Sequence, residues 1–378
     1  MLLRQVSPRE VGRLHQTCKQ INQALSGTSE KTAAFWRWMG SRWLRLRQGT
    51  RSDFARLWHT SWFDATSNVV RLSSGDRIPR NIQSGTVIER FPEEPLFVVC
   101  GDKLLGVLRG DGSVVVLAEL DVDCHWFPSC VVAGGRLIVG GANPGSISTS
   151  KQPVFVIPLE SLLRGETTPE VLHGHTGRVV GMAVHKQRVV SVSWGGEALV
   201  WNVAEGMPIE QVGTIVHGLS ELFCVAICDE FICLGSQTGA STLFRAQEPF
   251  ELVRRLPPMK PYVLSCSFHN NDSELLMSDS EGLVRRVQVA TGEILAEQRH
   301  GESKIRKVLV TPRGQVVCGC GDGSIRVLNL DDLVQTAVFQ IAPSSVRMLL
   351  LNPSGNGLVV GLRLKYATAA IAFVQGAK

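Results

Sequence analysis

The sequence predicts an all-β seven-bladed β-propeller, preceded by a small all-α N-terminal domain. Three observations lead to this expectation. The stretch 174–202 contains three short apolar runs separated by turn residues, which is typical of a small antiparallel sheet. Similar stretches recur at intervals of roughly 40–45 residues, as expected for blades that stack side by side. Residues 1–48 show a helical spacing of apolar residues instead.

The repeat can be measured at the last apolar residue of each expected third strand. The intervals are 40, 44, 43, 43, 41 and 45 residues, for the series Leu117, Ile157, Trp201, Phe244, Val287, Leu328 and Phe373. A Gly-Asp-Gly-Ser turn also occurs at 110–113 and at 321–324, and Asp-Gly between apolar runs is a strong hairpin signal. We therefore expect seven blades, with Thr86–Arg90 as the strand that closes the last blade and Val69–Leu72 as the alternative.

The segment from Gly174-His175 to Trp201 resembles one WD repeat, the blade unit of a β-propeller. This resemblance implies a hydrogen-bonded set of Asp, His, Ser and Trp. Here the set matches His175, Ser193 and Trp201, with Gly195 where the family has Asp. Other blades match the set even less completely, so we expect apolar packing between sheets to supply most of the stability.

The first 48 residues contain two expected helices. Ser7 caps the first helix, Pro8 fits its first turn, and Glu10 completes a capping box. Apolar residues then recur every three or four positions along both helices, at Val11, Leu14, Cys18, Ile21, Leu25, Phe35, Trp36, Met39, Trp43 and Leu46. Two short helices cannot cover this much apolar surface between themselves, so part of it must face another surface.

This helical stretch resembles the second and third helices of an F-box. The matching residues are Ser7, Pro8, Arg9, Glu10, Arg13, Leu14, Cys18, Lys19, Phe35, Trp36 and Arg37. The family's first helix would lie upstream, so we expect it to be truncated here. An F-box before a WD propeller implies a substrate receptor of an SCF-type ubiquitin ligase, in which the head binds a Skp-family adaptor and, through it, a cullin. The adaptor contacts that the resemblance implies are Leu3, Pro8, Val11, Leu14, Cys18, Ile21, Leu25, Phe35 and Trp36.

Three regions follow from these patterns. We expect an F-box-like domain at 1–48, a linker helix with the ring-closing strand at 49–90, and the propeller at 91–378. Target binding is expected at one propeller face, where Arg306 and Arg347 lie six residues before Pro312 and Pro353 and so occupy the same position in adjacent blades. Paired arginines suit a carboxylate or phosphate, which predicts an acidic or phosphorylated target. The predicted target-binding residues are Arg178, Tyr262, Lys304, Arg306, Arg347 and Trp126. Trp194 is expected to add a further apolar anchor at the same face.

Other functions are disfavoured. The chain has no phosphate-binding loop, nucleophile elbow or metalloprotease motif, so we expect neither catalysis nor a cofactor or metal. It has no apolar run long enough to cross a membrane. Residues 1–60 hold eleven Lys and Arg against three acidic residues. This basic head leaves a cytoplasmic, nuclear or organellar location open, but its aromatic residues belong to the apolar stripes, which disfavours nucleic-acid binding. The alternative function is a constitutive scaffold subunit of a large protein or ribonucleoprotein assembly.

Overall fold

The chain forms two compact units, Met1–Asn68 and Val69–Lys378. The computed structural model describes residues 82–89, 95–101, 103–110, 114–120, 122, 124, 126–142, 152–341, 345–352, 357–362 and 371–375, all in the second unit. The expected F-box-like domain at 1–48, the linker helix, and all nine implied adaptor contacts therefore lie outside the described residues. The boundaries expected for these regions stay predictions.

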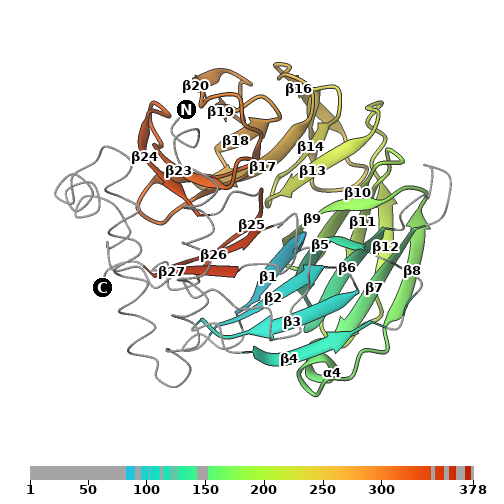
Figure 1. Ribbon diagram of the computed structural model, residues 1–378. Coiled ribbons are helices and arrows are strands. Elements are labelled where there is room, and N and C mark those ends of the chain that lie inside the picture. Colours follow the sequence, from blue (N-terminus) through green and yellow to red (C-terminus); the bar gives the residue numbers. More distant parts are fainter. Residues whose placement is uncertain are drawn as a thin grey trace, which may run out of the picture. The chain divides into compact units, whose positions relative to one another are not determined.

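The second unit consists of antiparallel sheets arranged around a common centre (Figure 1). One short helix, α4 (Leu159–Leu163), follows the seventh strand. The strands of the first three sheets are β1 (Ser84–Ile88), β2 (Leu96–Gly101), β3 (Leu104–Leu108), β4 (Val114–Glu119), β5 (Trp126–Ala133), β6 (Arg136–Ala142), β7 (Gln152–Pro158), β8 (Glu170–His175), β9 (Val179–His185), β10 (Arg188–Ser193), β11 (Ala198–Asn202) and β12 (Glu210–Thr214).

The remaining strands continue the same order along the chain. They are β13 (Leu222–Ile227), β14 (Phe231–Ser236), β15 (Ser241–Arg245), β16 (Leu252–Leu256), β17 (Val263–His269), β18 (Glu274–Asp279), β19 (Leu283–Gln288), β20 (Ile294–Arg299), β21 (Ile305–Val310), β22 (Gln315–Cys320), β23 (Ser324–Asn329), β24 (Gln335–Gln340), β25 (Val346–Leu351), β26 (Gly357–Leu362) and β27 (Ile371–Gln375).

In the described residues, six sheets have four strands each and follow the chain in order, from β1–β4 to β21–β24. The last sheet, β25–β27, has three. First strands contact the first strands of neighbouring sheets, and β25 contacts both β21 and β1. The structure is thus a propeller with six complete blades, and the prediction of seven blades is wrong. The sequence count used third-strand ends, which a three-stranded sheet also has, so it could not distinguish that sheet from a complete blade.

The first sheet corrects two further expectations. The expected closing strand Thr86–Arg90 overlaps β1, which pairs with β2 rather than with the last sheet. Leu117 lies in β4, so it does not end a third strand. The Gly-Asp-Gly-Ser sequence at 110–113 accordingly falls between the third and fourth strands of its sheet, whereas the same sequence at 321–324 falls between the second and third strands. The alternative closing strand, Val69–Leu72, lies outside the described residues.

Burial changes from the centre of the propeller to its edge. Second strands such as β10, with the sequence RVVSVS, are buried along almost their whole length. Each is covered on both faces by neighbouring sheets, which explains its nearly continuous run of small and β-branched residues. Fourth strands such as β20, with the sequence ILAEQR, are mostly exposed. The core therefore lies between the sheets, in the separate apolar layers that join neighbouring blades.

A register shift occurs near the start of the first strand in six consecutive sheets, and in five of them it leaves a single first-strand residue outside the ladder. Between β21 and β22, Ile305 pairs with Cys320 and Lys307 pairs with Gly319, which leaves Arg306 outside the ladder. Such a bulge redirects a side chain at the strand end. We call the end of the propeller where the first strands begin the first-strand face. The equivalent bulge residues of the other sheets are Val180, Phe223, Leu264 and Arg347.

A buried hydrogen-bonded set stabilises the third sheet. His175 Nε2 lies 2.6 Å from Ser191 Oγ, and Trp201 Nε1 donates to the same oxygen at 2.8 Å. All three side chains are buried. The expectation that Ser193 fills this role is wrong, because the Ser193 hydroxyl donates to Glu197 instead. Ser191 and Ser193 lie on the same face of β10, so strand alternation alone does not distinguish them.

Glu197 supplies the carboxylate that the sequence comparison did not find at Gly195. Its Oε2 atom lies 3.8 Å from His175 Nδ1, which is beyond hydrogen-bond length but close enough for an electrostatic interaction. The hydroxyls of Ser193 and Thr176 both donate to it. Burial raises the pKa of Glu197, but His175 and the two hydroxyl donors outweigh burial and lower the pKa to about 2. The carboxylate is therefore ionised at neutral pH.

Candidate functional site

Three aromatic side chains from consecutive sheets meet at the first-strand face. Trp194 lies between β10 and β11, Phe223 is the bulge residue of β13, and Tyr262 directly precedes β17. The ring centroids of Trp194 and Phe223 are 5.6 Å apart, and those of Phe223 and Tyr262 are 5.3 Å apart. Arg178 Cζ lies 5.0 Å from the Trp194 ring, and Lys304 Nζ lies 5.9 Å from the Tyr262 ring. We call these five residues the aromatic row.

The Trp194 end of the row is held by two turns in close contact. Trp194 N donates to Arg178 O at 3.0 Å, which places the indole beside the arginine. A Cβ atom on Gly177 would lie 2.2 Å from Gly195 N. Only glycine permits this approach of the two backbones, so Gly177 is what allows Arg178 to lie over the indole.

Tyr262 at the other end has an unusual backbone conformation. Its φ is 64°, in the left-handed region that bulky residues rarely adopt. This conformation costs about 1–2 kcal/mol for a non-glycine residue. It is held by the loop 257–262 and by a hydrogen bond from Tyr262 N to Gln237 O at 2.7 Å. Glycine would relieve the strain here, so the aromatic side chain itself is the feature that needs an explanation.

The row combines accessible aromatic surface with positive charge. All three rings are half-buried, so one part packs on the propeller while another stays open to solvent. Lys304 is exposed, and among the described residues its ammonium forms no ion pair. A ligand with an acidic group can therefore meet a cation without breaking an existing ion pair of Lys304.

The six predicted target-binding residues all lie at or near the starts of first strands. Arg178, Tyr262 and Lys304 belong to the aromatic row. Arg306 and Arg347 occupy equivalent bulges, in agreement with their sequence spacing, and Arg306 Nε donates to Ser345 Oγ at 2.9 Å. Trp126 begins β5, but its side chain lies outside the described residues. The structure thus brings three of the six together in one row.

Phe223 was absent from the residues expected at this face, whereas Trp194 was expected only as an additional apolar anchor; both are central to the row. Phe223 follows a buried leucine at the start of a strand, so its sequence context reads as ordinary core. Its signal is positional: it occupies the bulge position that Arg306 and Arg347 occupy in their own sheets. Trp194 lies in a Ser-Trp-Gly-Gly turn, where a large aromatic residue stands out among small turn residues.

The described part of the chain offers little for metal binding. No group of three or more His, Cys, Asp or Glu side chains there is placed to hold a metal ion. Its cysteines are free and buried, and burial raises the pKa of both Cys318 and Cys320, which disfavours the thiolate forms that bind metals. No helix in this part is long and apolar enough to span a bilayer.

No protein-family model and no curated protein matches the chain. Solved structures do match it. The WD40 β-propeller domain of Doa1 aligns with a TM-score of 0.63 and 16% identity, covering 82% of this chain and 97% of that domain. A chain of the mitotic checkpoint complex gives 0.68, 16%, 84% and 97%, and the computationally designed Ika8 protein gives 0.55, 19%, 74% and 80%. The chain therefore has a WD40 β-propeller fold.

Proposed function

We propose that this chain is a non-catalytic interaction subunit that captures an acidic or phosphorylated segment of a target protein on its first-strand face. The aromatic row is the observation that carries the proposal. Trp, Tyr and Arg are the residues that most often dominate binding energy at protein interfaces. The aromatic row contains Trp194 and Tyr262, with Arg178 at the Trp194 end and Lys304 at the Tyr262 end. The strained conformation of Tyr262 supports a binding role, because strain concentrates at functional positions.

The proposal extends to the partner of the N-terminal head. In this proposal the head binds a Skp-family adaptor and thereby joins the propeller to a cullin ubiquitin ligase. The support is the F-box resemblance of Ser7–Glu10 and Phe35–Arg37, together with apolar stripes that two short helices cannot cover. The mitotic checkpoint complex supplies an example of a similar fold within a protein assembly.

Tyr262→Gly tests the role of the aromatic row. Glycine removes the ring but relieves the positive φ, so a binding role predicts weaker ligand binding with an unfolding midpoint equal to or above that of the wild type. The probe is a short fluorescein-labelled Asp/Glu-rich peptide carrying one phosphoserine, measured by fluorescence anisotropy with the full chain. Asn271→Gly is the matched control, because Asn271 also has a positive φ, of 52°, and lies in the β17–β18 turn, away from the row.

We expect Tyr262→Gly to weaken peptide binding about tenfold or more, the usual effect of losing an interface anchor, while Asn271→Gly leaves binding unchanged. A Tyr262→Gly chain that is clearly destabilised yet still binds normally would identify Tyr262 as a packing residue. The unphosphorylated peptide distinguishes carboxylate recognition from phosphate recognition.

Co-expression with a Skp-family adaptor tests the head separately. We expect the wild type and Tyr262→Gly to form a complex with the adaptor, and the Leu14→Asp, Trp36→Ala double variant to lose it while still binding the peptide. If the wild type forms no complex, the ligase part of the proposal fails. The scaffold function, in which the head docks into a larger assembly, would then take its place.

A further inference from the structure

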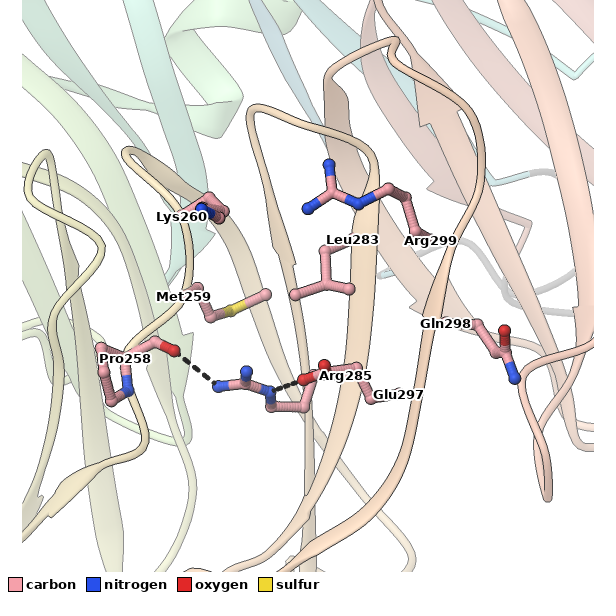
Figure 2. A pocket seen from close by; sticks show the side chains of 8 residues that line it. All are labelled: Pro258, Met259, Lys260, Leu283, Arg285, Glu297, Gln298 and Arg299. Atoms are coloured by element: carbon pink, nitrogen blue, oxygen red, sulfur yellow. Dashed lines mark hydrogen bonds and ion pairs between the residues drawn. The ribbon is translucent and has the colours of Figure 1, made fainter.

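A cavity of about 490 Å³ lies between the loop that precedes β17 and the outer strands of the fifth sheet, β17–β20 (Figure 2). One wall is the loop 257–262, which ends at Tyr262, and the other is formed by β19 and β20. Its lining residues are Pro258, Met259, Lys260, Leu283, Arg285, Glu297, Gln298 and Arg299. Because Tyr262 ends this loop, a single short loop contributes both to the cavity wall and to the aromatic row.

The loop wall is held rigidly by hydrogen bonds. Arg285 NH1 donates to the carbonyls of Pro257 and Pro258, at 2.7 and 3.1 Å, while its Nε atom pairs with Glu297 (Figure 2). Met259 N donates to Gly239 O at 3.0 Å, and Lys260 N donates to Asp279 Oδ2 at 3.3 Å. Three prolines in this six-residue loop further restrict the backbone. A preformed wall requires little ordering when a ligand binds.

The cavity has an apolar floor and a positively charged rim. Met259 and Leu283 are 7% and 8% exposed and form the floor. Lys260 and Arg299 are exposed above it, and Figure 2 shows the Arg299 guanidinium reaching over Leu283 toward the side where Lys260 lies. Glu297 does not neutralise this rim, because its carboxylate is already paired with Arg285.

The two rim cations differ in their availability. Lys260 forms no ion pair through its side chain among the described residues. Arg299 NH1 donates to Glu281 O at 2.6 Å and lies 3.3 Å from Glu281 Oε2, but both side chains are more than two-fifths exposed. Exposed pairs of this kind contribute little energy, so a ligand carboxylate can share the guanidinium.

We propose that this cavity is a second recognition subsite, which accepts an aliphatic side chain followed by a carboxylate from the same acidic target segment. The aliphatic group would contact Met259 and Leu283, and the carboxylate would bind Lys260 and Arg299. This inference rests on the proposed function, since the segment reaches the cavity from Tyr262. It adds a sequence requirement to the target: an acidic or phosphorylated group for the row, and a Leu-Glu pair at a fixed distance along the chain.

Paired peptides test the subsite by fluorescence anisotropy with the full chain. The two-anchor peptides carry an Asp/Glu cluster with one phosphoserine, a Gly-Ser spacer of varied length, and Leu-Glu. The one-anchor peptides replace Leu-Glu with Ser-Ser. We expect one spacer length to bind about tenfold more tightly than its one-anchor partner, the contribution of one charge-assisted hydrogen bond. Lys260→Glu with Arg299→Glu should remove this difference, whereas Arg313→Glu, in the β21–β22 turn, should not.

The outcomes separate the cavity from the row. Equal binding of one- and two-anchor peptides, with both weakened by Tyr262→Gly, would overturn the subsite and leave the row intact. A two-anchor advantage that disappears in Lys260→Glu with Arg299→Glu but survives in Tyr262→Gly would support the subsite without the row. If no peptide binds the wild type, both proposals are overturned for acidic peptides.

Methyl NMR gives a readout at the floor of the cavity. The chain has seven methionines, so a protein labelled at the methionine methyls gives few signals, and the Met259→Leu variant assigns the relevant one. We expect the two-anchor peptide to shift the Met259 signal, while Met207, which is 60% exposed in the segment before β12, stays unchanged. An unchanged Met259 signal at saturating peptide would overturn the proposed position of the aliphatic anchor.

Discussion

Replacing Ser191 by Ala tests whether the buried hydrogen-bonded set stabilises the third sheet. Ser191 Oγ meets both His175 Nε2 and Trp201 Nε1, and the three residues are 0%, 1% and 4% exposed. The indole N–H can only donate, so the serine oxygen accepts from it, and the serine hydrogen is then available to His175 Nε2. Alanine would leave two buried polar groups without partners. At about 1–3 kcal/mol for each of the two unsatisfied groups, we expect a loss of about 2–6 kcal/mol.

The matched control is Ser241→Ala in the fourth sheet. Ser241 is 1% exposed, and its hydroxyl has no hydrogen-bond partner in the described structure. The substitution is chemically the same, but it removes an unsatisfied polar group. We therefore expect Ser241→Ala to leave the stability unchanged or to raise it by about 1 kcal/mol. The contrast between two buried serines isolates the hydrogen bonds from the change in volume.

Urea unfolding of the full chain, with hydrogen exchange of the β10 and β11 amides, measures both variants. Hydrogen exchange is needed because the sheets of a propeller can open separately, and a single midpoint would then combine several events. We expect faster exchange in β10 and β11 for Ser191→Ala, and no change there for Ser241→Ala. Equal effects of the two substitutions would refute the reasoning. A Ser191→Ala, Trp201→Phe double variant that is strictly additive would refute the coupling between the two residues.

Three further predictions concern single positions. Folding lowers the pKa of Glu197 from 4.5 to about 2. Its contribution to stability is therefore complete above pH 4.5 and is lost as the pH falls toward 2. In Glu197→Gln, the free energy of unfolding should consequently depend less on pH between 4.5 and 2. Asp279→Ala should cost about 2–4 kcal/mol in urea unfolding, because this buried carboxylate accepts the backbone N–H groups of residues 260, 281 and 283. Gly319→Ala should lower the free energy of unfolding by about 1–3 kcal/mol, since its Cβ would lie 2.6 Å from Val346 Cγ1, whereas at Gly321 the nearest atoms are 3.4 Å away and alanine should be tolerated.

The sequence indicated the repeat architecture because blades are built from local signals. Each second strand is a short apolar run, and turn residues separate it from its neighbours. These patterns act over a few residues and recur every 40 to 45 positions, so they are visible without any tertiary information. Strand starts are marked by the same short-range signals. Residues at those starts, such as Arg178 and Lys304, could therefore be predicted to lie on one face of the propeller.

The pairing of β1 and the set around Ser191 depended on the tertiary structure. The segment Thr86–Arg90 has the composition of a strand, but both the first and the last sheet offered it an edge, and local sequence does not encode which edge it joins. Ser191 and Ser193 lie on one strand face, and only the position of Trp201 Nε1 determines which hydroxyl it meets. The WD-repeat resemblance implied a carboxylate at position 195, where this chain has glycine. In the structure Glu197 takes that role instead.

The candidate site shows the same division. The sequence alone showed that cationic residues stand at the starts of strands and that the loop 257–262 contains three prolines. Only the tertiary structure decided that Phe223 joins Trp194 to Tyr262, and that Lys260 and Arg299 border one cavity. Contacts between neighbouring blades bring together residues about 40 positions apart, and their geometry depends on how the sheets pack. A single sequence records which residues are present, but the packing of one sheet on the next determines which of them meet.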